Sequence, residues 1–447
     1  MFSKILIANR GEIAVRIIRA CREMGIETVA VYLEADRDAL HTQMADEAIC
    51  IGPPAPGESY LNVQNIISAT ILSGAEAIHP GFGFLSENSK FAKICEECNI
   101  TFIGPGAECI YNMGNKSNAR NIMSKAGVSI IPGSEKAIDS SEELLEVARN
   151  IGYPVMIKAS AGGGGRGIRI VRSEEGIIRS YENAKAEAKI AFGDDTIYLE
   201  KFIESPKHIE IQILGDNFGN IVYLGERDCS MQRRNQKLLE EAPGKVITDE
   251  LRVSMGEMAV KAAKAVDYNN AGTVEFLLDK DGRYYFMEMN TRIQVEHPIT
   301  EMVTGIDLIK EQIKIAFGEK LSFSQEDIKI SGHSIECRIN AENVKKGFMP
   351  SPGKITELYV PGGPNVRVDS AVYSGYNIPP YYDSMIAKLI VYGKDREEAI
   401  CRMRRALGEF VIEGVDTNID FQFELISSDE FINGTYDTSF IEKSFKY

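Results

Sequence analysis

The sequence lacks the features that would place the protein in or across a membrane. No apolar run approaches the roughly 18 consecutive residues that a transmembrane helix needs. The first strand-like stretch, Ile5–Ala8, leads directly into the polar turn Asn9–Gly11, so the N-terminus carries no signal-peptide core. Cysteines are few, 8 in 447 residues, and their scatter is typical of reduced thiols. We therefore expect a cytoplasmic protein without membrane association.

An excess of positive charge is also missing. Lys and Arg number 50 against 65 Asp and Glu, which gives a formal net charge of −15 at pH 7. Such an acidic chain is a poor partner for nucleic acid or for an anionic lipid surface, so we expect neither. One basic run does occur, comprising Arg227, Arg233, Arg234 and Lys237. It could form a local anion site, although a basic run is more often ordinary surface.

Both common nucleotide-binding signatures are absent. Ile5–Ala8 and Glu27–Tyr32 are predicted strands, and an amphipathic helix between them completes a β-α-β unit of a parallel sheet. The turn at 9–14 reads NRGEIA instead of GxGxxG, which argues against a dinucleotide-dependent dehydrogenase. The Gly-Lys-Ser/Thr ending of a Walker A loop is missing as well.

A glycine-rich loop nevertheless joins two predicted strands. Tyr153–Lys158 ends in a lysine, the loop 162–167 reads GGGGRG, and Ile168–Val171 is the next strand. Glycine lets backbone N–H groups approach oxygen atoms closely, so this loop predicts contact with phosphate. A flexible linker is the alternative.

Oxygen-bearing side chains gather in the stretch 284–297. While the backbone is extended, Glu288 and Asn290 share one face. A turn of two or four residues at 279–282 would place Glu275, on the preceding strand, on the same face, whereas a three-residue turn would reverse the parity. Two carboxylates and an amide oxygen packed together favour Mg²⁺ or Mn²⁺. A strand with one solvated face is the alternative.

Taken together, the sequence resembles the biotin carboxylase family of ATP-grasp enzymes, and most of all the stand-alone subunits of acetyl-CoA carboxylase. The resemblance covers essentially the whole chain, and its specificity comes from the order of the matching segments. These are 9–14 (NRGEIA), 79–88 (HPGFGFLSEN), 162–167 (GGGGRG), 226–234 (ERDCSMQRR), 288–297 (EMNTRIQVEH) and 381–384 (YYDS).

The resemblance implies an α/β fold that is α+β in parts, and the chain length agrees with about three domains. We expect a Rossmann-like parallel-sheet domain at 1–114 and an ATP-grasp domain at 115–330 with a mobile lid at about 131–203. A mixed α+β biotin carboxylase domain would follow at 331–447.

The resemblance also assigns site residues. The expected ATP ligands are Lys116, Lys158, Gly164, Gly165, Glu200, Lys201, Phe202, Ile203, His208, Asn235, Glu275 and Glu288. The expected ligands of two Mg²⁺ or Mn²⁺ ions are Glu275, Glu288 and Asn290. Bicarbonate is expected at Lys237, Arg292, Gln294 and the backbone of Val295, and biotin at Arg338 and Phe82. The expected catalytic residues are Arg292, Glu296, Arg338 and Lys237, with Glu296 as the general base.

The implied reaction is the ATP-dependent carboxylation of biotin by bicarbonate, through carboxyphosphate. Biotin is attached to a lysine that follows methionine in carrier domains, and this chain contains no Met-Lys dipeptide. The substrate is therefore expected on a separate biotin carboxyl carrier protein, with carboxyltransferase subunits as further partners. Arg19 and Glu23 match positions at the family's dimer contact, which implies a homodimer.

Two residues depart from the pattern of well-known family members. Asn235 replaces a histidine beside the nucleotide ribose, and Phe82 replaces a tyrosine near biotin. We expect acetyl-CoA carboxylase, which feeds malonyl-CoA and fatty acid synthesis, to be the parent system; propionyl-CoA or pyruvate carboxylase is the alternative. A different ATP-grasp ligase, one that forms carbamoyl phosphate or carboxylates a purine intermediate, and a non-catalytic ATP sensor are the other interpretations.

Overall fold

The computed structural model describes residues 1–134, 136–159, 168–192 and 195–445. The chain forms two compact units. Unit 1 comprises Met1–Val128, Lys207–Phe276 and Glu288–Tyr447, and unit 2 comprises Ser129–Pro206 and Leu277–Met287. The three-domain division expected from the sequence stays a prediction.

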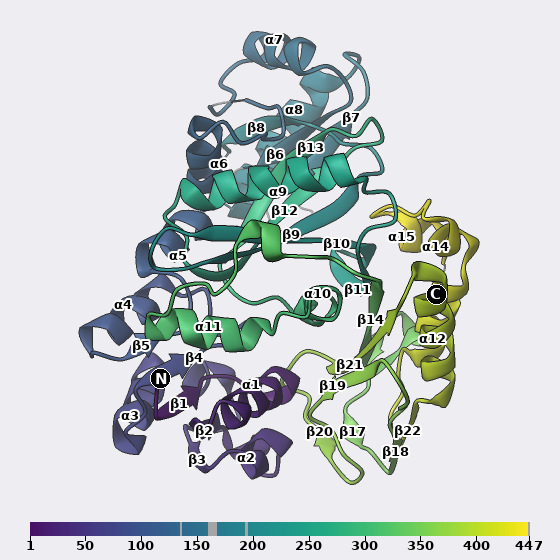
Figure 1. Cartoon of the computed structure of the whole chain (residues 1–447). Helices are drawn as coiled ribbons and strands as arrows, with labels where there is room; N and C mark the ends of the chain where they lie inside the picture. The colour runs from purple at the N-terminus through teal and green to yellow at the C-terminus, as the bar shows by residue number, and fades with distance from the viewer. Residues whose placement is uncertain (135, 160–167, 193–194, 446–447) are drawn as a thin grey trace. The chain divides into compact units, whose positions relative to one another are not determined.

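The N-terminal part of unit 1 is built on a five-stranded parallel sheet, as the β-α-β pattern predicted (Figure 1). The strand order is β3-β2-β1-β4-β5, with β1 central. Buried Ile and Val side chains of the sheet belong to two hydrophobic clusters. The strands are β1 (Lys4–Ile7), β2 (Glu27–Tyr32), β3 (Glu47–Cys50), β4 (Ala77–His79) and β5 (Thr101–Phe102). The helices are α1 (Gly11–Glu23), α2 (Leu40–Met44), α3 (Val63–Ser73), α4 (Ser89–Glu97), α5 (Ala107–Gly114) and α6 (Lys116–Lys125).

An eight-stranded sheet in the order β13-β12-β9-β10-β11-β14-β21-β19 carries most of the candidate site. The pairs from β9 to β19 along this order are antiparallel. The strands are β9 (Lys207–Gly215), β10 (Ile221–Arg233), β11 (Gln236–Ala242), β12 (Asn270–Leu278), β13 (Tyr284–Asn290), β14 (His333–Asn340), β19 (Val366–Ser370) and β21 (Met385–Gly393). The helices of this part are α9 (Asp249–Lys264), α10 (His297–Thr304) and α11 (Leu308–Phe317).

The C-terminal part of unit 1 packs helices on β14 and β21. Helix α12 contacts both strands, and the shared core contains aliphatic and aromatic side chains of the sheet and helices. The helices are α12 (Arg396–Glu409), α13 (Ile419–Ser427), α14 (Asp429–Asn433) and α15 (Phe440–Ser444). Short strands complete it: β15 (Glu342–Asn343), β16 (Met349–Pro350), β17 (Gly353–Lys354), β18 (Glu357–Tyr359), β20 (Asn377–Ile378) and β22 (Val411–Glu413). Among the described residues, no helix is both long enough and apolar enough to cross a bilayer.

Unit 2 contains a three-stranded antiparallel sheet in the order β7-β6-β8. The alternating burial of β6 places Val155 and Ile157 in a core with Leu144 and Tyr181 from the helices. The elements are α7 (Ser141–Ile151), β6 (Val155–Ala159), β7 (Ile168–Val171), α8 (Ile177–Phe192) and β8 (Ile197–Lys201). The lid predicted at about 131–203 falls in this unit.

The turn between β12 and β13 differs from the one assumed for the metal site. The N–H of Asp279 donates to the carbonyl of Arg283 at 2.8 Å, and this bond closes a loop of three residues, 280–282. The regular strands end at Leu278 and begin at Tyr284, on either side of this closing pair. The Asp279 carboxylate stabilises this loop by accepting from the N–H groups of Asp281 and Arg283, both at 2.9 Å. The odd length is the case that reverses the parity, so the hairpin does not place Glu275 on the face of Glu288 in the way that a loop of two or four residues would.

Candidate active site

The ammonium group of Lys237 lies among three buried carboxylates. Its Nζ atom is 2.5 Å from Glu210 Oε2, 3.0 Å from Glu275 Oε1 and 2.6 Å from Glu296 Oε1. The lysine side chain is 12% exposed and each carboxylate side chain is at most 4% exposed. Burial lowers the pKa of Lys237, but the three carboxylates outweigh burial and raise it well above its usual value. Lys237 is therefore a fixed cation at the centre of an acidic cluster.

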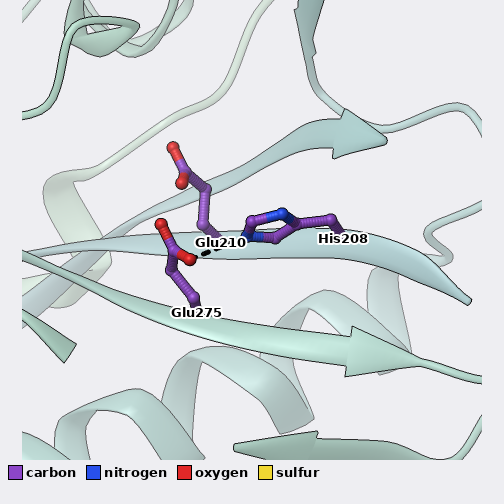
Figure 2. A group of neighbouring side chains, drawn as sticks. All are labelled: His208, Glu210 and Glu275. Carbon is purple, nitrogen blue, oxygen red and sulfur yellow. Dashed lines mark hydrogen bonds and ion pairs between the residues drawn. The ribbon is translucent and has the colours of Figure 1, made fainter. Parts of the chain in front are cut away.

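Neighbouring strands bring these side chains together. His208 and Glu210 lie two residues apart on β9 and share a face, because successive side chains of a strand point to opposite faces. Glu275 lies on the adjacent strand β12, and its Oε2 atom is 2.9 Å from His208 Nε2 (Figure 2). The ligand atoms of these three residues lie within 4.8 Å of one another. Because the Lys237 ammonium contacts both carboxylates, their charges are compensated by the protein itself.

Arg227 compensates the charge of Glu210 from β10. The two residues are direct partners in the β9–β10 ladder, and Arg227 Nε is 2.5 Å from Glu210 Oε1. Its other nitrogens donate to Gln212, Thr273 and Thr300, and the side chain is completely buried. Elsewhere in the basic run, the Arg233 guanidinium lies 4.0 Å from the ring centroid of Phe348 and Arg234 is exposed. The run is therefore not one anion site: Arg227 and Lys237 both contact Glu210 of the cluster, whereas Arg233 and Arg234 lie elsewhere.

Glu296 is held by two cations from different strands. Besides Lys237, it contacts Arg338 of β14, whose NH2 atom is 2.9 Å from Glu296 Oε2. Burial would raise the pKa of Glu296, but Lys237, Arg338 and Arg227 outweigh burial and hold the pKa well below its usual range. The carboxylate is therefore ionised and able to accept a proton.

Arg292 and Gln294 lie next to this carboxylate cluster. Arg292 NH1 donates to Gln294 Oε1 at 3.1 Å, and Gln294 Nε2 donates to Glu275 Oε1 at 3.2 Å. Arg292 Nε also donates to Glu87 Oε2 at 2.8 Å, and its side chain is 19% exposed. Arg292 is therefore anchored by a carboxylate, while part of its side chain remains accessible to solvent.

The three predicted metal ligands are brought together only in part. Asn290 Nδ2 donates to Glu275 Oε1 at 2.9 Å. Glu288 instead faces Lys116 at 3.5 Å, with 37% and 88% of the respective side chains exposed. Among the described residues, Glu288 belongs to no group of three or more carboxylate, thiol or imidazole ligands within 4.8 Å. The donor types, two carboxylates and an amide oxygen, nevertheless fit a hard divalent cation.

Several predicted nucleotide ligands lie in unit 2. Lys158 of β6 forms an ion pair with Glu200 of β8. The Lys201 ammonium donates to the carbonyls of Gly152 and Tyr153 at 2.9 and 2.8 Å, the N–H of Phe202 donates to Pro154, and Ile203 is nearly buried. The side chain of Lys201 is thus engaged within the unit. Gly164 and Gly165 lie outside the described residues.

Asn235, Phe82 and Val295 lie at other places in unit 1. Asn235 is exposed and takes a left-handed φ of +64° in the two-residue turn between β10 and β11. The carbonyl of Phe82 accepts from Asn9 Nδ2 at 2.7 Å, and its ring packs against the core. The carbonyl of Val295 accepts from Lys388 Nζ at 2.8 Å.

Besides Glu210, which contacts Lys237, three further partners of the predicted site residues were not identified from the sequence. Glu240 Oε1 is 2.6 Å from Arg338 Nε, and burial raises the pKa of Glu240 to about 7 even though Arg338 opposes this rise. Glu87 holds Arg292, and Lys388 holds Val295. Glu87 belongs to the matching segment 79–88, which could have indicated it. Glu240 and Lys388 carry no sequence signal, because their partners are distant along the chain.

Family models describe the chain from end to end. The model "Biotin carboxylase, N-terminal domain" matches residues 1–110, and "Carbamoyl-phosphate synthase L chain, ATP binding domain" matches residues 115–324. "Biotin carboxylase C-terminal domain" matches residues 336–443.

Known proteins resemble the chain over nearly their whole length. "Biotin carboxylase 1" of Bacillus subtilis is 62% identical over 443 residues, which cover 99% of this chain and 98% of that protein. A pyruvate carboxylase subunit of Methanothermobacter thermautotrophicus is 56% identical over 99% of this chain and 90% of that protein. The crystal structure of the biotin carboxylase domain dimer of Hydrogenobacter thermophilus 2-oxoglutarate carboxylase, in complex with MgADP, ADP and bicarbonate, matches with a TM-score of 0.90 at 55% identity. That match covers 99% of this chain and 98% of that chain.

Proposed function

The chain belongs to the biotin carboxylase family and is an ATP-dependent ligase, and on that premise we propose that it carboxylates biotin on a separate carrier protein. ATP and bicarbonate would be the other substrates, and carboxyphosphate the intermediate. The observation that carries the proposal is the position of Glu296 between Lys237 and Arg338. One base and two cations then lie together, the combination that would deprotonate an anionic substrate and stabilise a developing oxyanion.

We propose that this arrangement activates bicarbonate. Bicarbonate is a weak, delocalised nucleophile, so it needs cations to position it and a base to remove its proton. Arg292, Gln294 and the Val295 backbone are the proposed cradle together with Lys237. A bicarbonate ion that draws Lys237 toward itself would weaken the Lys237–Glu296 contact of 2.6 Å. The pKa of Glu296 would then rise toward its usual value, which makes the carboxylate a stronger base where it is needed.

Arg338 is proposed to act on biotin. Its guanidinium contacts Glu240 at 2.6 Å and Glu296 at 2.9 Å, and the side chain is 16% exposed. A fixed cation stabilises the enolate-like oxygen that forms when N1′ of biotin loses its proton and attacks the carboxyl group. Phe82 is the proposed apolar neighbour of the biotin ring.

The proposed ATP site uses His208, Lys116, Lys158, the lid glycines, residues 200–203 and Asn235, together with Glu275 and Glu288. Glu275, Glu288 and Asn290 would hold two Mg²⁺ ions, or Mn²⁺, which offset negative charge on the phosphates. Glu275 is suited to this role because it stays ionised. Burial raises its pKa, but Lys237 and His208 lower the pKa by more than burial raises it, so the net shift is downward.

We propose acetyl-CoA carboxylase as the parent system, in the cytoplasm, with a biotin carboxyl carrier protein and carboxyltransferase subunits as partners. Its product, malonyl-CoA, feeds fatty acid synthesis. A homodimer is also proposed, because a dimer is described for the related 2-oxoglutarate carboxylase domain. In this chain Glu23 forms an ion pair with Lys310 at 2.6 Å, and Arg19 is exposed on the same helix α1.

The experiment is ATP cleavage by the purified protein with bicarbonate and free biotin as variables. The proposal predicts cleavage that depends on bicarbonate and increases when biotin is added. Bicarbonate-dependent cleavage that biotin never stimulates would favour a different ATP-grasp ligase. Nucleotide binding without cleavage would favour an ATP sensor.

Pyruvate carboxylase is the second candidate for the parent system, and the 56% identity to a protein named as one of its subunits favours it. Propionyl-CoA carboxylase is a further alternative. Capturing the biotinylated carrier with this protein from its own cell extract, and identifying the carboxyltransferase that accompanies the carrier, separates the three parent systems.

A further inference from the structure

Lys388 is a completely buried cation next to the proposed site. It lies on β21, and its side chain has no exposed surface. Its Nζ atom donates to the carbonyl of Val295 at 2.8 Å and is 3.1 Å from Glu12 Oε2. Glu12 lies in the first turn of α1, and its side chain is 4% exposed. Residues from three distant parts of the sequence therefore meet at the residue that precedes Glu296.

The strand register explains why Lys388 reaches this point. Lys388 is directly opposite Arg338 in the β14–β21 ladder, and directly opposite Asp369 in the β19–β21 ladder. Directly opposite residues share a face of the sheet, so the two cations lie side by side. Arg338 contacts the side chain of Glu296, and Lys388 contacts the main chain of Val295. Two adjacent cations of the sheet therefore fix two consecutive residues of the loop.

Lys388 is held in its charged form by its surroundings. Burial lowers its pKa, but Glu12, Glu336 and Asp369 outweigh burial and raise it above the usual value. A buried ion pair costs desolvation energy, and an apolar side chain of similar volume often stabilises a fold as well or better. Stability of the fold alone therefore does not explain a charged side chain at this position. The need for a fixed cation that donates to a backbone carbonyl does explain it.

We propose that Lys388 is a positioning residue that, held in place by Glu12, fixes the Val295 carbonyl and so sets the main chain that carries the bicarbonate contact and the base. This inference rests on the proposed function, because it deepens the role given to Val295 and Glu296. Glu12 lies in the family-matching segment 9–14, which contains none of the expected ligands. The contact with Lys388 gives this segment a role at the site. Loss of the cation would misplace the backbone contact to bicarbonate while leaving the ligands of ATP unchanged.

Three variants of the full chain test the proposal: Lys388→Met, the double variant Glu12→Gln with Lys388→Met, and Lys388→Arg. The double variant removes the charges of both members of the pair, so Glu12 is not left as a buried carboxylate without its cation. Lys388→Arg keeps a cation and a donor at the same position. The matched control is Arg252→Met with Glu226→Gln, which removes a buried ion pair between α9 and β10, at 2.7 Å, that has no proposed role in binding or catalysis.

The readouts are the KM for bicarbonate, the KM for ATP and kcat in the ATP-cleavage assay, together with the Tm of each variant. We expect the KM for bicarbonate to rise about tenfold or more in the two Met-containing variants, since a hydrogen bond from a charged donor is lost. Lys388→Arg should restore most of this loss, and the KM for ATP should stay within about twofold of wild type. The control pair should lower the Tm without changing either KM.

A KM for bicarbonate within twofold of wild type in the double variant would overturn the inference, as would an equal rise in both KM values. If the Met-containing variants do not fold, Glu12→Gln alone decides, because it removes the carboxylate that holds Lys388 in place: a bicarbonate-specific rise in KM supports the positioning role, and unchanged kinetics overturn it. A wild-type protein that shows no bicarbonate-dependent ATP cleavage would overturn the proposed function and this inference with it. An active wild type with unaltered variants would overturn the inference alone.

Discussion

Lys237 has a structural and a proposed catalytic duty, and the two can be separated. Three carboxylates depend on its charge, with contacts between 2.5 and 3.0 Å. Arg227 already compensates Glu210, whereas Glu275 is otherwise paired only with His208 and amide donors among the contacts described above. Removing Lys237 leaves carboxylates facing one another in a buried place, so the fold suffers together with any chemistry.

Lys237→Met should therefore lower the free energy of unfolding by about 3–5 kcal/mol, the usual cost of leaving a buried charge unpaired. Adding Glu210→Gln removes part of the repulsion and should recover a measurable share of that stability. Activity should not recover, because the proposed bicarbonate contact is still missing. Urea denaturation and ATP-cleavage assays on the two variants check this. Recovery of both quantities would show that Lys237 serves the fold only.

At the scale of single elements, the β12–β13 turn shows where pattern reasoning fails. The sequence correctly predicted both strands, but their relative register depends on whether the loop closes over two, three or four residues. That choice is made by the Asp279 carboxylate and by the left-handed φ of +80° at Gly282. A single residue of loop length moves every side chain of one strand to the other face, so the strand pattern alone could not establish that Glu275 and Glu288 share a face.

Gly282→Ala should lower the free energy of unfolding by about 1 kcal/mol, because alanine is strained at this φ. No atom lies within 4 Å of the added Cβ, so the cost comes from the backbone alone. Gly408→Ala is the matched control, since Gly408 also has open space around it but lies in α12 without a left-handed φ. Urea denaturation should show no loss for the control. Equal effects at both positions would contradict the role of the φ value.

Helix α2 carries a buried histidine that links stability to pH. Burial lowers the pKa of His41 from 6.5 to about 4, and its Nε2 atom lies 3.3 Å from the Val31 carbonyl. The unfolded chain binds a proton at His41 below pH 6.5, whereas the folded chain does so only near pH 4. Stability is therefore lost as the pH falls through this window, by about 2 kcal/mol between pH 7.5 and pH 5.

His41→Gln should remove that share of the pH dependence. The measurement is the free energy of unfolding at pH 7.5 and pH 5 for wild type and variant, with Thr42→Val on the same helix as the control. The difference between the two pH values should shrink by about 2 kcal/mol in His41→Gln and stay unchanged in Thr42→Val. A variant that keeps the full pH dependence would show that His41 titrates normally in the folded protein.

At the scale of the whole molecule, the sequence predicted what lies close together along the chain. The parallel sheet with its β-α-β start and the segment that contains Arg292, Gln294 and Glu296 are local patterns. Arg338 was indicated by the resemblance, but other partners of the site come from distant strands that it did not indicate: Glu240, which contacts Arg338, lies on β11, and Lys388, which contacts Val295, lies on β21. One sequence carries no record of which distant strands pair, so these contacts could not be predicted.

The division of the chain into compact units also depends on contacts between distant parts of the sequence. Unit 2 takes in Leu277–Met287, far along the sequence from Ser129–Pro206, so the hairpin turn belongs to a different unit from Glu275 and Glu288. A division into consecutive segments cannot express such an insertion. The residues that meet around Lys237 all belong to unit 1.

The most direct test of the central claim, that Glu296 between Lys237 and Arg338 is the base that starts carboxyl transfer to biotin, follows labelled carbon. The protein is incubated with ATP, Mg²⁺, free biotin and ¹³C-bicarbonate, and carboxybiotin is measured for wild type and Glu296→Gln. The account predicts labelled carboxybiotin from wild type and a fall of about 10²–10⁴-fold in Glu296→Gln, with nucleotide binding preserved. Wild-type ATP cleavage without labelled carboxybiotin, or equal yields from both proteins, would contradict it.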